Sequence, residues 1–163
     1  NLTLGMLDPG DTALLDAARS TGLLQTVITP HPNGLMQEIS EGGTGLSGGQ
    51  RQLVNLTRAF LRRPKIWLLD EPTASMDRAL EKRIVQAFTE RLRDDDTLFL
   101  VTHKHEMLPL VDRIIVVANK KIVADGPRDT VLERLKNQST QAQKKAQNST
   151  AVLNTKEAGG AHE

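Results

Sequence analysis

The sequence predicts an α/β fold, because two apolar runs of strand length flank a helix of crossover length. The runs cover residues 66–69 and 98–101, and uninterrupted apolar runs are typical of parallel strands that are buried on both faces of a sheet. Between the runs, apolar residues recur at helical spacing and form one stripe, made of Leu80, Ile84, Val85, Phe88 and Leu92. A strand, a helix and a second strand in this order indicate a βαβ unit.

Composition narrows the possible function classes. The 163 residues carry a formal net charge of +1 and only 2% aromatic residues, whereas nucleic-acid-binding surfaces are basic and rich in stacking rings. Cysteine is absent from the sequence, which excludes disulfides and thiolate metal sites. No apolar run approaches the roughly 20 residues of a transmembrane helix. Any link to a membrane is therefore expected to need a partner.

Helical signals come before the strands. Residues 11–21 have helical spacing that ends at Gly22, and a second short helix is expected over residues 23–28. After a glycine-rich loop, a third helix begins at Ser47 and is closed by Pro64.

The last third of the chain predicts a hairpin and a helix. Residues 114–117 and 121–123 form the hairpin, and Gly126 and Pro127 precede the helix. The composition then becomes polar and typical of disorder. We therefore divide the chain into a helical part (1–62), a part with the strands (63–136) and a disordered tail (137–163).

The segment Leu46-Ser47-Gly48-Gly49-Gln50 carries the first candidate site. A Ser at the N-cap with a Gln three residues later is typical of a capping box. Capping does not explain the two glycines, because each costs about 1 kcal/mol relative to alanine inside a helix. The start of a helix offers free N–H groups and a positive dipole end, and glycine lets an anion approach that backbone closely. The segment therefore predicts a phosphate site.

A dinucleotide-binding loop is an alternative interpretation of the same region. Gly43, Gly45 and Gly48 have the G-x-G-x-x-G spacing, and Asp70 follows at about the required 20 residues. Such a loop needs a buried strand before it, and residues 35–41 make a poor one. We keep this NAD-binding Rossmann interpretation as the less favoured alternative.

Asp70 and Glu71 form a carboxylate pair at the end of the first strand. Ligands of α/β sheets bind outside the carboxyl ends of the strands. Pro72 is expected to restrict Glu71 to extended geometry and so to aim its side chain. An Asp that holds Mg²⁺ and a Glu that polarises a water are the pair that phosphoryl-group hydrolysis needs.

Two further residues have candidate roles. His103 follows the second strand, so it is expected at the same sheet edge as Asp70 and Glu71, although a lone histidine is more often structural. Asp77 is expected to cap the helix that begins at Arg78 and can also belong to an intersubunit loop. His105 lacks such support.

Taken in order, these motifs resemble those of ABC transporter ATPases. Residues 46–52 resemble the signature motif, residues 66–71 Walker B with its catalytic glutamate, residues 72–77 the D-loop, and His103 the H-loop. The resemblance covers about residues 1–136 and implies the C-terminal part of an ABC-type P-loop NTPase fold, with a helical signature subdomain followed by part of the parallel-sheet core. Met76 stands where the D-loop usually has a leucine.

A narrower resemblance points to type I secretion exporters of the large-adhesin type. It rests on residues 32–35, 39–46 and 114–119. In such exporters the stretch that corresponds to residues 41–43 touches the intracellular loops of the membrane domain. The resemblance thus implies ATP-driven export of a protein across the bacterial inner membrane, with this domain on the cytoplasmic face and the membrane spans expected upstream in the same chain.

The chain lacks a G-x-x-x-x-G-K-[ST] loop, the Walker A motif of the family. Family members form head-to-tail dimers in which the signature of one subunit meets ATP held by the other subunit's Walker A. The resemblance therefore implies that residues 46–50 and Asp77 serve a site in trans. Asp70 would hold Mg²⁺ in the chain's own site, and Glu71 and His103 would be catalytic there. The 163-residue chain alone is expected to be inactive.

Two other function classes stay open at this stage. The chain could belong to a soluble ABC-type ATPase that acts in DNA repair or translation, although its charge balance does not favour this. It could also be an interaction module that uses only the signature face. The intact Asp70, Glu71 and His103 argue against the second class.

Overall fold

The computed structural model describes residues 2–138, which fall into two compact units. The first unit ends at Val111 and the second begins at Asp112. None of the helices in the described part of the chain is long and apolar enough to cross a bilayer.

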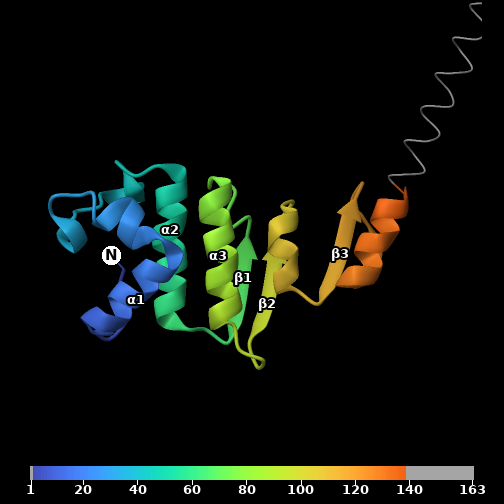
Figure 1. Cartoon of the computed structure of the whole chain (residues 1–163), viewed down its shortest axis with the longest axis horizontal. Helices are drawn as coiled ribbons and strands as arrows, with labels where there is room; N and C mark the ends of the chain where they lie inside the picture. The colour runs from blue at the N-terminus through green and yellow to red at the C-terminus, as the bar shows by residue number, and fades with distance from the viewer. Residues whose placement is uncertain (1, 139–163) are drawn as a thin grey trace, which may run out of the picture. The chain divides into compact units, whose positions relative to one another are not determined.

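The first unit contains the predicted βαβ arrangement (Figure 1). Strands β1 and β2 are parallel, with Ile66 opposite Thr97 and Asp70 opposite Val101. In chain order the unit comprises α1 (Asp11–Thr21), α2 (Gly48–Arg62), β1 (Ile66–Asp70), α3 (Arg78–Arg91) and β2 (Thr97–Val101). The α/β prediction is confirmed.

Short irregular helices connect these elements. Before α2 there are a π-helix (Leu24–Ile28) and two 3₁₀-helices (Gly34–Met36 and Glu41–Gly43), and a third 3₁₀-helix (His105–Leu110) follows β2. No strand forms over residues 35–41. The dinucleotide-binding alternative needs a strand there, so the structure excludes it.

The core of the first unit lies between its helices and one face of the sheet. Phe60, Trp67 and Phe88 contact one another edge to face, with ring centroids 4.9 to 5.8 Å apart, a preferred geometry for aromatic pairs. The hydroxyls of Thr21 and Thr57 lie 2.7 Å apart and join α1 to α2. The helical segment and β1 thus share one core.

The prediction that both strands are buried on both faces is wrong for the described residues. Trp67 is 4% exposed, but the next side chain along β1, Leu68, is 76% exposed. On β2 Phe99 is 60% exposed, while Leu98 packs against the core. The helices of the first unit cover one side of this two-stranded sheet, and no other element of that unit covers the opposite side.

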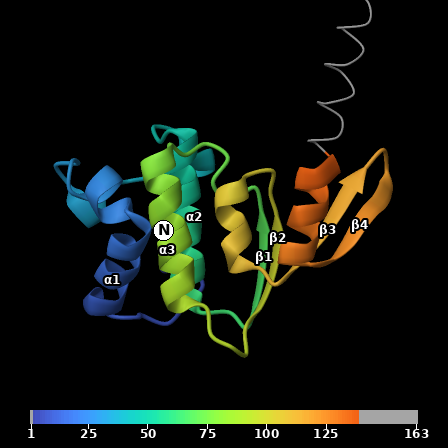
Figure 2. The ribbon, with the colours of Figure 1, turned by 45° about the vertical axis from the view of Figure 1, so that its right-hand side comes forward.

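The second unit is a hairpin followed by a helix (Figure 2). Strand β3 (Arg113–Ala118) pairs antiparallel with β4 (Lys121–Pro127). Asn119 and Lys120 both have positive φ, at 49° and 62°, as two-residue hairpin turns with right-handed strand twist require. Residues 128–138 are helical, so residues 137 and 138 of the predicted tail extend the helix and the rest of it lies outside the described residues.

Candidate functional site

The ends of β1 and β2 bring Glu71 and His103 together. The ladder continues one residue past β1, because Glu71 N donates to Val101 O at 2.9 Å. Glu71 Oε1 and His103 Nδ1 are 2.7 Å apart. An ionised carboxylate can only accept a hydrogen bond, so Nδ1 carries a proton and donates it in this contact. The predicted proximity of the two side chains is confirmed.

The backbone of Glu71 differs from the prediction. Its φ is +45°, so the residue is left-handed, and the expectation that Pro72 would make it extended is wrong. Such a conformation costs on the order of 1–3 kcal/mol and persists where surrounding contacts enforce it. Here Glu71 O accepts from Ala74 N at 3.1 Å and from Gln52 Nε2 at 3.2 Å. These contacts turn the carbonyl away from the strand direction.

The Glu71 carboxylate has one oxygen without a partner. Oε2 is buried and makes no hydrogen bond among the described residues, although buried polar atoms nearly always find partners. This oxygen retains unused acceptor capacity, although it is closed to solvent in this conformation. A general base needs that capacity.

Asp70 is exposed at the carboxyl end of β1. Within the described residues no group of three His, Cys, Asp or Glu side chains could hold a metal ion. Mg²⁺ is commonly bound by one or two carboxylates together with waters and substrate phosphates. Asp70, as the one protein carboxylate bound to the ion, would therefore fit Mg²⁺ that arrives with phosphate.

The amino terminus of α2 has the predicted capping box. Gln50 N donates to Ser47 Oγ at 3.2 Å, and Ser47 N donates to Gln50 Oε1 at 2.8 Å. A methyl group on Gly49 would lie 2.7 Å from Ser75 O, which no real Cβ tolerates. Gly49 is therefore required by packing against the loop after β1, whether or not phosphate binds there.

The loop between β1 and α3 is held at both ends. Asp77 caps α3 as predicted, because its Oδ1 accepts from Leu80 N at 2.8 Å. Lys104, next to His103, donates from Nζ to Thr73 O at 2.7 Å and pairs with Glu81 Oε1 at 3.3 Å. Thr73 Oγ1 also donates to that oxygen, at 2.9 Å.

Sequence reasoning did not find the roles of Lys104 and Gln52. Gln52 contacts both Glu71 and Ser75 from α2. Nothing in the spacing of these residues along the chain signals such contacts. His105 begins the 3₁₀-helix after β2.

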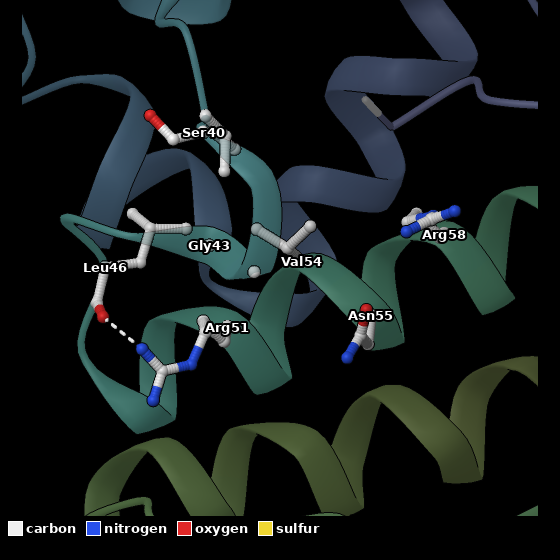
Figure 3. Close-up of a pocket in the computed structure, with 9 residues that line it drawn as sticks. Ser40, Gly43, Leu46, Arg51, Val54, Asn55 and Arg58 are labelled. Carbon is white, nitrogen blue, oxygen red and sulfur yellow. Dashed lines mark hydrogen bonds between the residues drawn. The ribbon is translucent and has the colours of Figure 1, made fainter.

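A pocket of about 320 Å³ lies between the loop before α2 and α2 itself (Figure 3). Arg51 and Leu46 line it, and Arg51 Nη1 donates to Leu46 O at 2.8 Å. Asn55 and Arg58 follow on the same helix. The pocket is also lined by Ile39, Ser40, Gly42, Gly43 and Val54.

The chain is similar to known ABC transporter proteins. Residues 16–74 match the family model of ABC transporters. The chain is 39% identical over 132 residues to the ATP-dependent lipid A-core flippase of Neisseria gonorrhoeae and 36% identical over 134 residues to the ABC-type transporter fsqE of Aspergillus fumigatus. A solved bacterial Atm1-family ABC exporter with ATP bound superimposes with a TM-score of 0.71 at 25% identity.

The matched regions cover most of this chain and a small part of each relative. They include 81% of the chain for both sequence relatives and 82% for the solved exporter. The chain spans 21% of the flippase, 10% of the fungal transporter and 23% of the solved exporter chain.

Proposed function

We propose that the chain is part of the ATP-binding domain of an ABC transporter and that it takes part in the ATP binding and hydrolysis that power export. The observation that carries the proposal is the contact of Glu71 Oε1 with His103 Nδ1 at 2.7 Å. It places a carboxylate and an imidazole at the carboxyl edge of a parallel sheet, where ligands of such sheets bind.

Each candidate residue of this edge then has a chemical role. The Glu71 carboxylate accepts a proton from the attacking water once the bound nucleotide opens access to Oε2, the buried oxygen that His103 leaves without a hydrogen bond. His103 orients the carboxylate through Nδ1 and presents Nε2 toward the γ-phosphate. Asp70 would hold Mg²⁺, which neutralises phosphate charge in such reactions.

The amino terminus of α2 serves a second site in this proposal. The N–H groups of Gly48 and Gly49, the first two residues of the helix, can bind the γ-phosphate of ATP held by another copy of the domain. Ser47 and Gln50 cap each other, so the segment stays ordered in the absence of phosphate. Leu46 supports it from the core, being 7% exposed, and Asp77 belongs to the same subunit boundary.

The proposed partners follow from this division of roles. They are a second ATP-binding domain, arranged head to tail, and a transmembrane domain whose intracellular loops contact the chain at the pocket beside Gly42 and Gly43. The second sheet face, where Leu68 and Phe99 are exposed, would be covered by the rest of the ATPase domain. The place of action is the cytoplasmic face of the bacterial inner membrane. The limits 1–62, 63–136 and 137–163 remain our proposed subdivision.

For the cargo we propose a protein, in a type I secretion system. This rests on residues 32–35, 39–46 and 114–119, which resemble exporters of large adhesins. A lipid-linked cargo is the second candidate, because a relative 39% identical to the chain is named a lipid A-core flippase. Turnover stimulated by only one of these cargo classes in the assay below decides between them.

The test is Glu71→Gln in the full-length protein that carries the chain. We expect ATP still to bind and to hold two copies together, while kcat falls by about 10²- to 10⁴-fold, the usual contribution of a general base. Mg²⁺-dependent phosphate release and sedimentation in the presence of ATP measure the two effects.

Two controls accompany this test. Glu106→Gln makes the same change at an exposed glutamate after β2 and should leave kcat unchanged. The purified 163-residue chain, which has no P-loop motif, should release no phosphate. Near-normal hydrolysis by the Glu71→Gln protein would remove Glu71 from the mechanism.

A further inference from the structure

One side chain joins the amino-terminal half of α2 to the loop that carries Glu71. Gln52 Nε2 donates to Glu71 O at 3.2 Å, and Gln52 Oε1 accepts from Ser75 N at 3.2 Å. The side chain therefore contacts both ends of residues 71–75 and is itself half-buried.

We propose that Gln52 is a positioning residue for hydrolysis. It holds Glu71 in its left-handed conformation and ties the position of this general base to the phosphate-binding end of α2. The inference rests on the function proposed for Glu71.

The first step of the argument concerns the backbone of Glu71. At φ +45° the conformation is one that residues other than glycine rarely adopt and that neighbouring groups must enforce. Glu71 N is held by β2 through Val101 O, and Glu71 O is held by Ala74 N and by Gln52 Nε2. Of the two donors to the carbonyl, only Gln52 comes from outside the loop. Removing its amide leaves the carbonyl tied only to its own turn.

The second step concerns the contact between α2 and the loop. A methyl group on Gly49 would meet Ser75 O at 2.7 Å, and one on Gly48 would meet Ser75 Oγ at 3.1 Å. The first turn of α2 thus packs directly on Ser75, and Gln52 lies one turn further along the helix. A displacement of this helix end by bound phosphate must move Ser75 and, through Gln52, the carbonyl of Glu71. Occupancy of the site in trans is in this way linked to the geometry of the general base in the chain's own site.

The experiment compares three variants of the full-length protein. Gln52→Met keeps the length of the side chain and removes both hydrogen bonds, while Gln52→Glu keeps the acceptor for Ser75 N and loses the donor to Glu71 O. For both we expect kcat to fall by about 10- to 100-fold, since displacements near 1 Å at a reacting group have effects of this size. The KM for ATP should stay within about twofold, because ground-state binding is not affected. Gln86→Met is the matched control, because the Gln86 side chain is exposed on α3 and, among the described residues, donates to Glu90 alone.

A second measurement separates positioning from general loosening of the fold. If Gln52 acts through Glu71, Gln52→Met added to Glu71→Gln lowers the residual single-turnover rate no further, because coupled residues are non-additive. In the full-length protein, the Ser75 amide should exchange its hydrogen faster in Gln52→Met and at the original rate in Gln86→Met.

The outcomes that overturn the inference are distinct from those that overturn the proposed function. Unchanged kcat in both Gln52 variants, a loss that lies in the KM for ATP, or additive effects with Glu71→Gln would each refute the positioning role while Glu71 keeps its own. Near-normal hydrolysis in Glu71→Gln instead refutes the proposed function, whatever the Gln52 variants do. If Gln52→Met does not fold, Gln52→Glu, which has nearly the same shape, decides the question by the same rates.

Discussion

Replacing Lys104 with methionine should destabilise the first unit strongly, because it strips a buried carboxylate of its cation. Glu81 is 3% exposed, and its Oε1 lies 3.3 Å from Lys104 Nζ and 2.9 Å from Thr73 Oγ1. In Lys104→Met the carboxylate keeps only the hydroxyl, and Thr73 O loses the donor that it has at 2.7 Å. Removal of one partner of a buried ion pair typically costs about 3–5 kcal/mol.

The lower end of this range applies here. The Lys104 side chain is 18% exposed, so water can partly replace the ammonium, and we expect a loss of about 3 kcal/mol in the free energy of unfolding. With an m-value of about 2 kcal/mol/M, the urea midpoint would fall by about 1.5 M. Trp67, the only tryptophan in the sequence and 4% exposed, reports the transition by fluorescence.

Two companion variants make the test specific. Lys82→Met changes an exposed lysine of α3 and should shift the stability by less than about 0.5 kcal/mol. The double variant Lys104→Met, Glu81→Met should recover most of the loss, because apolar residues can replace a buried pair at little cost. A Lys104→Met protein as stable as the Lys82→Met protein would show that Glu81 does not depend on its cation.

Two further predictions concern packing and pH. Gly49→Ala should lower the free energy of unfolding by about 1–3 kcal/mol, because the added methyl group would overpack against the backbone oxygen of Ser75 at 2.7 Å. Gly48→Ala should cost less, because its methyl group would meet the Ser75 side chain at the longer distance of 3.1 Å. Equal urea midpoints for the two variants would contradict this. Hydrogen bonding by the Arg113 guanidinium holds the pKa of Asp125 below its ordinary value, so the pair stabilises the hairpin above the ordinary Asp pKa and loses that effect as the pH falls through the lowered one. In Arg113→Gln an NMR titration should find the pKa of Asp125 raised toward its ordinary value, and an unchanged pKa would refute the assignment.

Features that depend on local pattern were predictable from the sequence. The helical stripe and the two apolar runs predicted the βαβ unit, and the residue types at Ser47 and Gln50 predicted the capping box that the structure contains. The contact between Glu71 and His103 followed from a rule of topology, because parallel strands place their carboxyl ends at one edge. Each of these inferences needed only the local sequence pattern or the strand order, and none required knowing which distant residues are in contact.

Contacts between separate elements could not be predicted in this way. Gln52 reaches a carbonyl 19 residues away and Lys104 one 31 residues away. Each bond depends on how helices and loop pack in three dimensions, which periodicity does not encode. The apolar runs likewise predicted that both faces of the sheet are covered. An apolar strand indicates only that its side chains favour burial. It does not say which segment covers it, and the exposed Leu68 and Phe99 show that the described residues supply one layer.

The backbone of Glu71 shows why a local rule gave a wrong answer at the most important residue. Proline disfavours the right-handed helical region for the residue before it, and from this we expected Glu71 to be extended. The rule excludes one region and does not choose between the remaining ones. Here the choice is made by Val101 O, Ala74 N and Gln52 Nε2, which hold the amide and the carbonyl of Glu71. Because these groups belong to β2, to the loop and to α2, the direction of the proposed general base depends on all three at once.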